Sequence, residues 1–345
     1  MEFCWGLPVI PTPQTKDLLE EYVDQSRQAE ANHFDSVLVS VAPTSVDPMV
    51  AATLIGIRVK GVRVLVAQNT NQMLPTVTAK ALNTLNKLVG DRVDINIVSG
   101  SASMVLSRDG KPESHEVRYA RTKEYVDLLQ QLRRGVTTFK GDFYQVENSD
   151  IYPKENPERR ARYFVAGSSE AAMRVAAQYG DAYILYAMDR QTLREHFSKV
   201  RDYAKEYGRE QIQCAVLVDI IARETTEEAF EAAYELLEKT PAALKRMTKL
   251  FLNNADSVGL RRYKDLRAED GYWVDEHLWG GLSTINPSNS VSIVGNYQDV
   301  ISTLLDFREA GASYILITSQ MGSSEIERIG QNILRPLKEK TLSTV

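Results

Sequence analysis

The chain has 345 residues, of which 43% are hydrophobic and 25% are charged, as is ordinary for a soluble globular protein. Its net charge of −5 and the lack of a basic tract argue against nucleic-acid binding. No apolar stretch reaches the roughly 18 residues that a transmembrane helix needs, and no signal peptide precedes the first strand-like run. We therefore expect a cytoplasmic protein that does not enter a membrane.

The two cysteines, Cys4 and Cys214, both lie in apolar runs. A free cysteine behaves as a small hydrophobic residue and is commonly buried. We therefore expect both cysteines to be buried, without a disulfide.

Strand-like and helix-like segments alternate through the first half of the chain. Runs of β-branched and aliphatic residues predict strands, and apolar residues at helical spacing predict helices. Asp47 is the expected N-cap of the second helix, with Pro48 at its first position. The expected strands are 3–7, 36–41, 63–67 and 94–98, and the helices that follow them are 15–32, 47–60, 75–89 and 119–133.

A hairpin then interrupts the alternation. The segment 136–146 contains two alternating runs around Gly141, which predicts two short antiparallel strands. Residues 240–292 are expected to be irregular, with short helical pieces. The remaining expected strands are 162–166, 182–186, 213–223 and 313–317, and the remaining helices are 169–178, 190–207, 226–239, 297–310 and 325–338.

The eight expected strands, most of them followed by a helix, predict one domain over residues 1–345 with an α/β fold. Alternation of strands and helices favours a parallel sheet, and eight such units favour closure into a (β/α)₈ TIM-type barrel over an open doubly wound sheet. Barrels of this kind place their active sites at the carboxyl ends of the strands. Polar residues at those ends are therefore the candidates for function.

Gly167, Ser168 and Ser169 stand between the strand at 162–166 and the next helix. Glycine lets the backbone approach a ligand closely, and two hydroxyls with the N–H groups of a helix N-terminus offer donors to a phosphate. The same residues also fit a turn glycine and a serine N-cap. The motif alone leaves both roles open.

Other polar residues also gather at expected strand ends. His115 and Tyr119 stand four residues apart in the loop and helix start after the fourth strand, so they can share a helix face and donate to an anion. Ser99 ends the fourth strand, and Gln68 and Asn69 end the third. These residues fit the active face of a barrel, but they also fit ordinary roles in loops, caps and helix packing.

Asp219 interrupts the apolar strand at 213–223. A carboxylate there is costly unless it is paired or faces a wet cavity, so Asp219 either lines the barrel mouth or pairs with a lysine or arginine. No Walker loop, G-x-G-x-x-G, G-x-S-x-G, H-E-x-x-H or CxxC motif occurs. Because the four histidines are widely scattered, no metal site is expected.

Motifs over nearly the whole chain resemble the FMNH₂-dependent alkanesulfonate monooxygenases, a branch of the bacterial-luciferase superfamily. Their order and spacing carry the resemblance, and no single motif decides it. They include Phe-Cys-Trp-Gly-Leu-Pro at 3–8, Asn-Ile-Val-Ser-Gly-Ser at 96–101, His-x-x-x-Tyr at 115–119, Phe-x-Gly-x-x-Tyr-x-Val at 139–146, Gly-Ser-Ser at 167–169, Asp-Ser-Val-Gly at 256–259 and Leu-Trp-Gly-Gly at 278–281.

The resemblance implies a barrel with a lid inserted before the last βα units, here about residues 245–292. It also implies FMNH₂ from a separate NAD(P)H-dependent flavin reductase, reaction with O₂ through a flavin C4a-hydroperoxide, and oxygen transfer to a substrate. The cofactor-binding residues that it implies are Tyr119, Ser168 and Ser169 at the FMN phosphate, with Gly167 and His115 nearby, and Gln68, Asn69 and Ser99 along the isoalloxazine ring.

The resemblance weakens at the substrate end. Sulfonate enzymes of the family carry a cysteine, an arginine, a histidine, a second arginine and a tyrosine where this chain has Ser45, Leu217, Asp219, Asn286 and Gln320. Without the two arginines and the histidine, the positive charge that binds a sulfonate is lost. We expect another substrate, for which an amine or hydroxyl would suit Asp219. Ser45, Asp219, Asn286 and Gln320 are the catalytic candidates.

These features predict a two-component FMNH₂-dependent monooxygenase that inserts one oxygen atom into a small organic substrate or an acyl group tethered to a carrier protein. Its expected partners are the flavin reductase, the substrate or its carrier, and further copies of itself in a dimer or tetramer. Two alternatives stay open. One is an F₄₂₀-dependent oxidoreductase that transfers hydride without O₂, and the other is a non-catalytic flavin-binding barrel.

Overall fold

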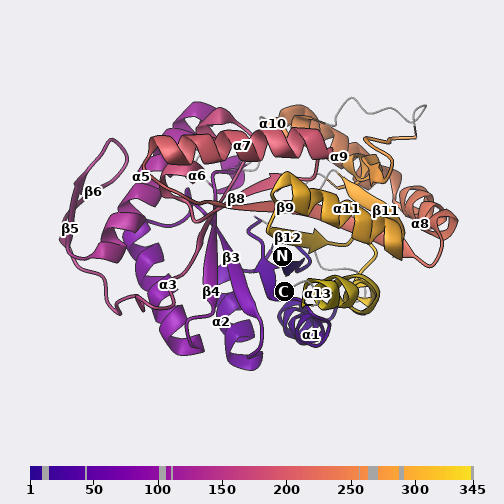
Figure 1. Ribbon diagram of the computed structural model, residues 1–345. Coiled ribbons are helices and arrows are strands. Elements are labelled where there is room, and N and C mark those ends of the chain that lie inside the picture. The colour runs from indigo at the N-terminus through magenta and orange to yellow at the C-terminus, as the bar shows by residue number, and fades with distance from the viewer. Residues whose placement is uncertain are drawn as a thin grey trace.

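The chain forms a closed barrel of eight parallel strands surrounded by helices, in the computed structural model shown in Figure 1. The strands follow the order β1-β2-β3-β4-β7-β8-β9-β12, and β12 pairs with β1 to close the barrel. The predicted (β/α)₈ TIM-type fold is confirmed. The structure describes residues 1–9, 15–42, 45–100, 106–109, 112–255, 257–262, 271–286 and 291–342.

The barrel strands and the helices outside them lie close to their predicted ranges. None of the described helices is long and apolar enough to cross a membrane. The strands are β1 (Glu2–Gly6), β2 (Ser36–Val39), β3 (Arg63–Asn69), β4 (Val93–Val98), β7 (Tyr163–Ala166), β8 (Ala182–Tyr186), β9 (Gln213–Arg223) and β12 (Tyr314–Thr318). The helices are α1 (Leu18–Ala31), α2 (Pro48–Arg58), α3 (Pro75–Val89), α5 (His115–Arg134), α6 (Glu170–Tyr179), α7 (Arg190–Glu206), α8 (Thr226–Lys239), α11 (Tyr297–Ala310), α12 (Ser324–Ile329), η4 (Gly330–Leu334) and α13 (Arg335–Leu342).

Capping residues define where two of these helices begin. Asp47 accepts a hydrogen bond from the N–H of Val50 and caps α2, as predicted. Ser114 accepts from the N–H of Val117 in the same way, so α5 begins at His115, four residues before its predicted start. The earlier start places the residues from His115 onward on a regular helix instead of in a loop.

Strand β9 is eleven residues long and extends beyond the end of the barrel. The carbonyl of Leu217 accepts a hydrogen bond from the chain after β8, and the N–H of Asp219 donates to the carbonyl of Val291 at 3.1 Å. The main-chain groups of residues two apart in a strand point toward the same neighbouring strand. The edge of β9 that pairs with β8 at residues 213–217 therefore pairs with β11 (Ser292–Asn296) at residues 219–223. Neither β11 nor its antiparallel partner β10 (Leu278–Trp279) was predicted.

The inserted segment is more regular than predicted. It contains a full helix, α9 (Ala242–Asn254), besides the short pieces α10 (Val258–Arg261) and η3 (Gly281–Thr284). Helix α9 buries only Thr248 and Leu252, and its apolar Leu244, Met247 and Leu250 are exposed. Residues 256, 263–270 and 287–290 of the predicted lid lie outside the described residues.

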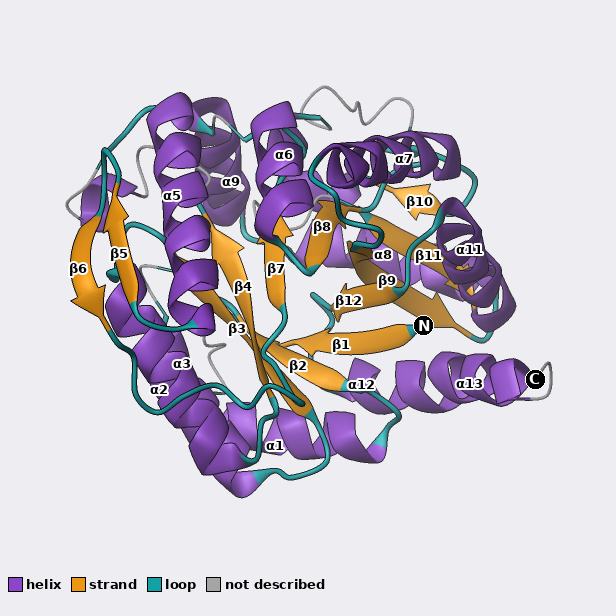
Figure 2. Cartoon of the chain, turned by 60° about the vertical axis from the view of Figure 1, so that its left-hand side comes forward, coloured by secondary structure: helices purple, strands orange, loops and turns teal. Residues whose placement is uncertain are grey.

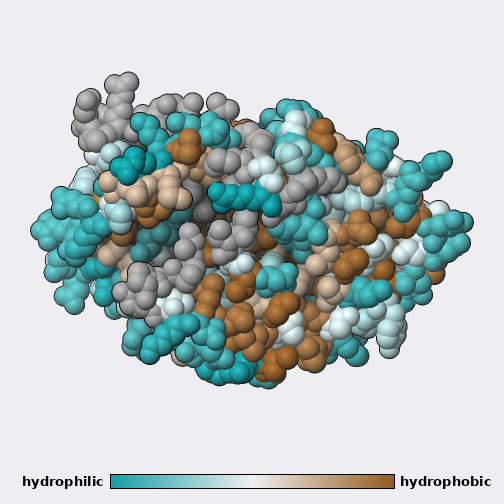
Figure 3. All heavy atoms as spheres, turned by 180° about the vertical axis from the view of Figure 1, so that it is seen from behind, coloured by the Kyte–Doolittle hydropathy of each residue, from teal (hydrophilic) through white to brown (hydrophobic). Residues whose placement is uncertain are grey.

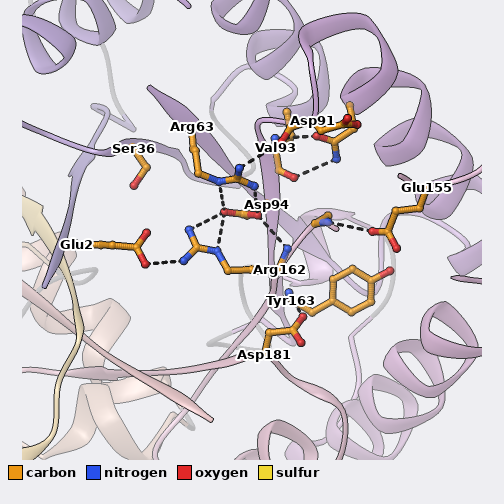
Figure 4. Close-up of polar contacts among 12 residues, drawn as sticks. Glu2, Ser36, Arg63, Asp91, Val93, Asp94, Glu155, Arg162, Tyr163 and Asp181 are labelled. Carbon is orange, nitrogen blue, oxygen red and sulfur yellow. Dashed lines mark hydrogen bonds and ion pairs between the residues drawn. The ribbon is translucent and has the colours of Figure 1, made fainter. Parts of the chain in front are cut away.

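A cluster of charged side chains closes the end of the barrel where the strands begin (Figure 4). The buried carboxylate of Asp94 contacts Arg63 at 2.6 Å and Arg162 at 2.9 Å, and Arg162 also contacts Glu2 at 2.7 Å. Burial alone would raise the pKa of Asp94, but hydrogen bonds and charge from the two arginines outweigh it and lower that pKa. The cluster therefore links the starts of β1, β3, β4 and β7.

The predicted hairpin consists of β5 (Thr137–Lys140) and β6 (Gln145–Ser149) and stands outside the barrel beside α5 (Figure 2). Glu124 of α5 accepts hydrogen bonds at 2.9 Å from the main-chain N–H groups of Asp142 and Phe143. The turn of the hairpin is thereby attached to the helix.

Both cysteines are buried and free, as predicted. Burial raises the pKa of Cys4 to about 12 and that of Cys214 to about 11. Neither thiol therefore ionises near neutral pH, which fits the role of a small core residue.

Candidate active site

A cavity of about 290 Å³ opens at the carboxyl ends of the barrel strands, the face where TIM-type barrels carry their active sites. The ends of β2, β3, β4, β7, β8, β9 and β12 build its wall, together with α5 and the inserted segment. One end and one edge of the wall are polar. Much of the rest is apolar and includes Leu38, Val41, Ala67, Ile184, Leu217 and Leu316.

Two glycines leave room around two hydroxyls at the polar end. Gly167 has a φ of +139°, which favours glycine, and a Cβ there would lie 2.5 Å from the hydroxyl oxygen of Tyr119. A Cβ on Gly259 of α10 would lie 3.1 Å from Oγ of Ser168. Tyr119 and Ser168 both line the cavity, so backbone and hydroxyl groups from three separate elements meet there.

The two adjacent serines have different surroundings. Oγ of Ser169 accepts a hydrogen bond from the N–H of Ala172 at 3.2 Å and caps α6. Ser168 instead lines the cavity. The N-cap role that the sequence allowed therefore belongs to Ser169, and the hydroxyl available to a ligand in the cavity is that of Ser168.

Helix α5 supplies positive charge at this end. His115, Arg118 and Tyr119 line the cavity, and the ring centroids of His115 and Tyr119 are 4.7 Å apart. Arg118 is fully buried and donates to the carbonyl of Glu113 at 2.8 Å. The carboxylate of Glu113 pairs with Arg121 at 2.5 Å. Hydroxyls beside a buried guanidinium form an arrangement that suits a phosphate.

Asn69, Asn96 and Ser99 place polar groups along one edge of the cavity. Asn96 is 8% exposed, and none of the described groups bonds its Oδ1. A buried amide oxygen without a partner is unfavourable, so Asn96 is suited to accept a hydrogen bond from a ligand. Gln68 lies outside the cavity wall formed by the described residues and donates to the carbonyl of Asn69 at 3.0 Å.

Asp219 is not among the described residues that line the cavity. It follows Leu217 on the same face of β9, and its side chain is fully buried. Its carboxylate accepts hydrogen bonds from the hydroxyl of Ser292 at 3.1 Å and from the N–H of Gln320 at 3.0 Å. Burial raises the pKa of Asp219 to about 7 despite these two bonds. Among the described residues it neither lines the barrel mouth nor pairs with a lysine or arginine, the two alternatives that the sequence left open.

The other three catalytic candidates also lie outside the cavity wall formed by the described residues. Ser45 follows β2, and its Oγ lies 3.3 Å from the hydroxyl of Tyr22. Asn286 ends the η3 turn, where its N–H donates to the carbonyl of Leu282. Gln320 follows β12 and is exposed. Their roles stay predictions.

The sequence model of one known family covers most of the chain: the luciferase-like monooxygenase family matches residues 1–314. The chain belongs to this family. The matched residues include the whole barrel from β1 to the start of β12.

Solved structures of several enzymes share the luciferase-like fold. The EDTA monooxygenase EmoA of Chelativorans sp. BNC1 is 17% identical, with a TM-score of 0.79 over 99% of this chain and 94% of that one. The oxygenating constituent of 3,6-diketocamphane monooxygenase of Pseudomonas putida, solved with FMN, is 16% identical, with a TM-score of 0.71 over 97% and 98%. The F₄₂₀-dependent tetrahydromethanopterin reductase of Methanopyrus kandleri is 16% identical, with a TM-score of 0.72 over 97% and 98%. At these identities the similarity shows the fold alone.

Among the cavity residues of this luciferase-like protein that were not selected from the sequence are Arg118, Asn96 and Tyr186. Arg118 stands three residues after His115, a spacing that puts both on one helix face only if α5 begins at His115. Asn96 interrupts the apolar strand β4, and that signal could have found it. Tyr186 ends β8 and packs on Leu252 of α9. An aromatic residue at the end of an apolar strand is typical of a core position, so the sequence held no signal for Tyr186.

Proposed function

We propose that this luciferase-like protein is the oxygenase component of a two-component system. It would take FMNH₂ from an NAD(P)H-dependent flavin reductase and use O₂ to oxygenate a small organic substrate or a carrier-tethered acyl group. The cavity is the observation that supports the proposal. Its end with the hydroxyls and the buried arginine matches the phosphate of a flavin, its polar edge matches the edge of the ring, and its apolar wall matches the face of the ring. Bound reduced flavin supplies two electrons to O₂, so that one oxygen atom enters the substrate and the other leaves as water.

The residues present fit this cofactor. Tyr119 and Ser168 would donate hydrogen bonds to the phosphate, Arg118 would add positive charge, and the ring of His115 could donate a further hydrogen bond. Asn96, whose buried amide oxygen has no partner among the described residues, would bond the polar edge of the ring. The apolar wall would exclude water and hold the apolar part of a substrate.

The substrate that we propose is not an alkanesulfonate. Among the described residues that line the cavity, the only side chains able to carry positive charge are His115 and Arg118. Both stand at the end that we assign to the phosphate. A sulfonate would therefore enter a region with an apolar wall and no cation to offset its desolvation.

The first prediction concerns the flavin. The protein should be isolated largely colourless and should bind FMNH₂ more tightly than FMN, because a separate reductase supplies the reduced form. Anaerobic fluorescence titration with both forms tests this, and O₂ uptake in the presence of a flavin reductase tests the reaction. A tightly bound yellow FMN that NAD(P)H reduces directly would contradict the proposal. Hydride transfer from reduced F₄₂₀ without O₂ uptake would favour the deazaflavin alternative.

A second prediction separates the two serines. Ser168→Ala should weaken FMNH₂ binding by about 1.5–3 kcal/mol, the value of a hydrogen bond to a charged group, and leave stability nearly unchanged. Ser169→Ala is the matched control and should instead cost about 1 kcal/mol of stability through loss of the N-cap. Flavin titration and thermal unfolding of both variants measure this. If Ser168→Ala keeps wild-type affinity, the phosphate binds elsewhere.

We also propose that the protein self-associates through the outer faces of α2 and α3. Val50 and Ile57 of α2 and Val77 and Leu88 of α3 are 64%, 47%, 48% and 58% exposed. Figure 3 shows the apolar side chains gathered over this face of the molecule, toward the bottom of the view. Helix α2 carries apolar residues on its inner and outer sides alike, a pattern typical of a helix buried on both sides. A twofold axis would let the same patch cover itself.

The third prediction tests this surface. Ile57→Glu should convert the oligomer to a monomer, because the interface would have to bury an unpaired charge. Val136→Glu places the same charge on a residue that is 66% exposed and outside the patch, and it should leave the mass unchanged. Light scattering after size exclusion measures both. A monomeric wild-type protein, or an unchanged mass for Ile57→Glu, would contradict this assembly.

A further inference from the structure

A second concave site lies at the end of the barrel opposite to the flavin cavity. It is a cleft of about 550 Å³ between α5, α6 and the segments that precede β7, β8 and β9. We call it the arginine cleft. Because strands begin here and end at the flavin cavity, the two sites are separated by the length of the barrel. The charged residues of the cleft wall are Arg133, Arg134, Arg160, Arg162, Arg209, Asp127 and Asp181.

Two of the five arginines form ion pairs with carboxylates of the protein. Arg162 pairs with Asp94 and Glu2 in the cluster of Figure 4. Arg133 pairs with Glu155 at 2.7 Å, and its guanidinium lies over a tyrosine ring. Breaking such buried pairs would be strongly unfavourable, so these two arginines stabilise the wall and are not free to turn toward a ligand.

The two aspartates of the cleft also have partners in the protein. Asp127 accepts hydrogen bonds from the hydroxyl of Tyr179 at 3.1 Å and from the amide of Gln131 at 2.9 Å. Asp181 accepts from the N–H of Tyr163 at 2.7 Å. Their carboxylates are therefore oriented by the protein, and neither forms a hydrogen bond with the remaining arginines among the described residues.

None of the other three arginines forms an ion pair with a carboxylate of the described residues, but the charge of Glu155 acts on Arg160 and that of Asp181 on Arg209. Among the described residues, Arg134 and Arg160 form no hydrogen bond or ion pair, and both are exposed. The side chain of Arg209 is half-buried and, among the described residues, donates only to the carbonyls of Ala176 and Ala177, at 3.3 and 2.9 Å. Burial lowers the pKa of Arg209, partly offset by the charge of Asp181. The cleft wall carries five arginines and two aspartates, an excess of positive charge in a chain whose net charge is −5.

We propose that the arginine cleft binds a small oxyanion with two or more anionic groups, and that Arg134, Arg160 and Arg209 are its ligands. A guanidinium binds phosphate and carboxylate oxygens through paired N–H donors, and its charge persists at every physiological pH. The cleft is larger than a single phosphate requires, so it accommodates a pyrophosphate ester or a tricarboxylate. This ligand would be distinct from the flavin and from the oxygenated substrate.

Calorimetric titration of the flavin-free protein at about 0.15 M salt, where the Debye length is about 8 Å, tests this proposal, with sodium pyrophosphate and sodium citrate as separate probes. We expect saturable binding of at least one probe. The double variant Arg134→Gln with Arg160→Gln should weaken that binding about a hundredfold, or about tenfold for each charge-assisted hydrogen bond lost. Tighter binding of pyrophosphate would identify a phosphate-bearing ligand, and tighter binding of citrate a carboxylate-bearing one.

The matched control is Arg194→Gln with Arg246→Gln, which makes the same change in net charge at exposed residues outside the cleft wall. It should change affinity less than about twofold, because charges beyond a Debye length are screened. Ser168→Ala should leave the affinity for both probes unchanged, since it alters the phosphate end of the flavin cavity at the other end of the barrel. Absence of saturable binding, an equal loss in the control pair, or a loss in Ser168→Ala would each overturn the proposal. None of these outcomes bears on the flavin function.

Discussion

Replacing Asp94 with alanine should lower the free energy of unfolding by about 3–5 kcal/mol, the usual cost of removing one partner from a buried ion pair. Asp94 is 1% exposed and contacts Arg63 at 2.6 Å and Arg162 at 2.9 Å. Alanine would remove the buried carboxylate that offsets the desolvation of both guanidinium groups, and Arg162 would keep its contact with Glu2. Denaturant unfolding followed by circular dichroism measures the loss.

Asp24→Ala is the matched control for this variant. Asp24 contacts Arg27 at 3.0 Å, but both side chains are largely exposed. An exposed pair of this kind contributes about 0–1 kcal/mol. If the two variants lose the same stability, burial is not what makes the Asp94 cluster important.

The same carboxylate predicts a dependence on pH. The pKa of Asp94 is lower in the folded chain than its ordinary value of about 4. Its contribution to stability is therefore complete above about pH 4 and is lost as the pH falls through the lower folded pKa. Unfolding free energies of wild type and Asp94→Ala should converge in that acidic range. A gap that stays constant down to acid unfolding would contradict this reasoning.

Asp219→Asn should raise the free energy of unfolding by up to about 4 kcal/mol near pH 8. The pKa of Asp219 is about 7 in the folded chain, against about 4 in an unfolded one, and this difference corresponds to about 4 kcal/mol. Because the folded state favours the protonated acid, stability falls as the pH rises from about 4 to about 7 and stays low above that. Asparagine cannot ionise, and it can still accept from Gln320 and donate to Ser292.

Stability measured at about pH 4 and about pH 8 decides this prediction. The gain of Asp219→Asn should be present at the higher pH and nearly absent at the lower one. Asp306→Asn is a control at a half-exposed residue, whose partner is Arg190 at 3.0 Å. It should show no comparable gain. Equal stability of Asp219→Asn and wild type at both pH values would mean that burial does not raise the pKa of Asp219.

Turnover of the same variant tests the predicted catalytic role of Asp219. A buried carboxyl group that lowers stability at neutral pH is a candidate for function, because residues that reduce stability are often retained when activity requires them. If Asp219 takes part in catalysis or positions the segment after β12, Asp219→Asn should lose turnover while keeping FMNH₂ affinity. A more stable variant with unchanged turnover would exclude Asp219 from the reaction.

Local signals account for the elements that were predicted correctly. Helix α3 occupies Pro75–Val89 as predicted, since a proline begins it and Gly90, with a φ of +80°, ends it. Strand β9 also matches its predicted range, because a long aliphatic run is typical of a strand that is buried on both faces. Strand β11 was missed because Ser292, Gly295 and Asn296 leave only two adjacent aliphatic residues in it, and because it depends on pairing with β9, far away in the sequence.

The sequence by itself determined the alternation of strands and helices, the closed barrel and the strand ends at which polar residues gather. Each of these follows from periodicity or from neighbours in the chain. Only the tertiary structure decided which polar residues share a cavity. It brought Tyr119 to Gly167 and Gly259 to Ser168, and it left Asp219 buried and outside the cavity wall that the described residues form. Such contacts depend on packing between elements that are distant in the sequence, and no local pattern specifies that packing.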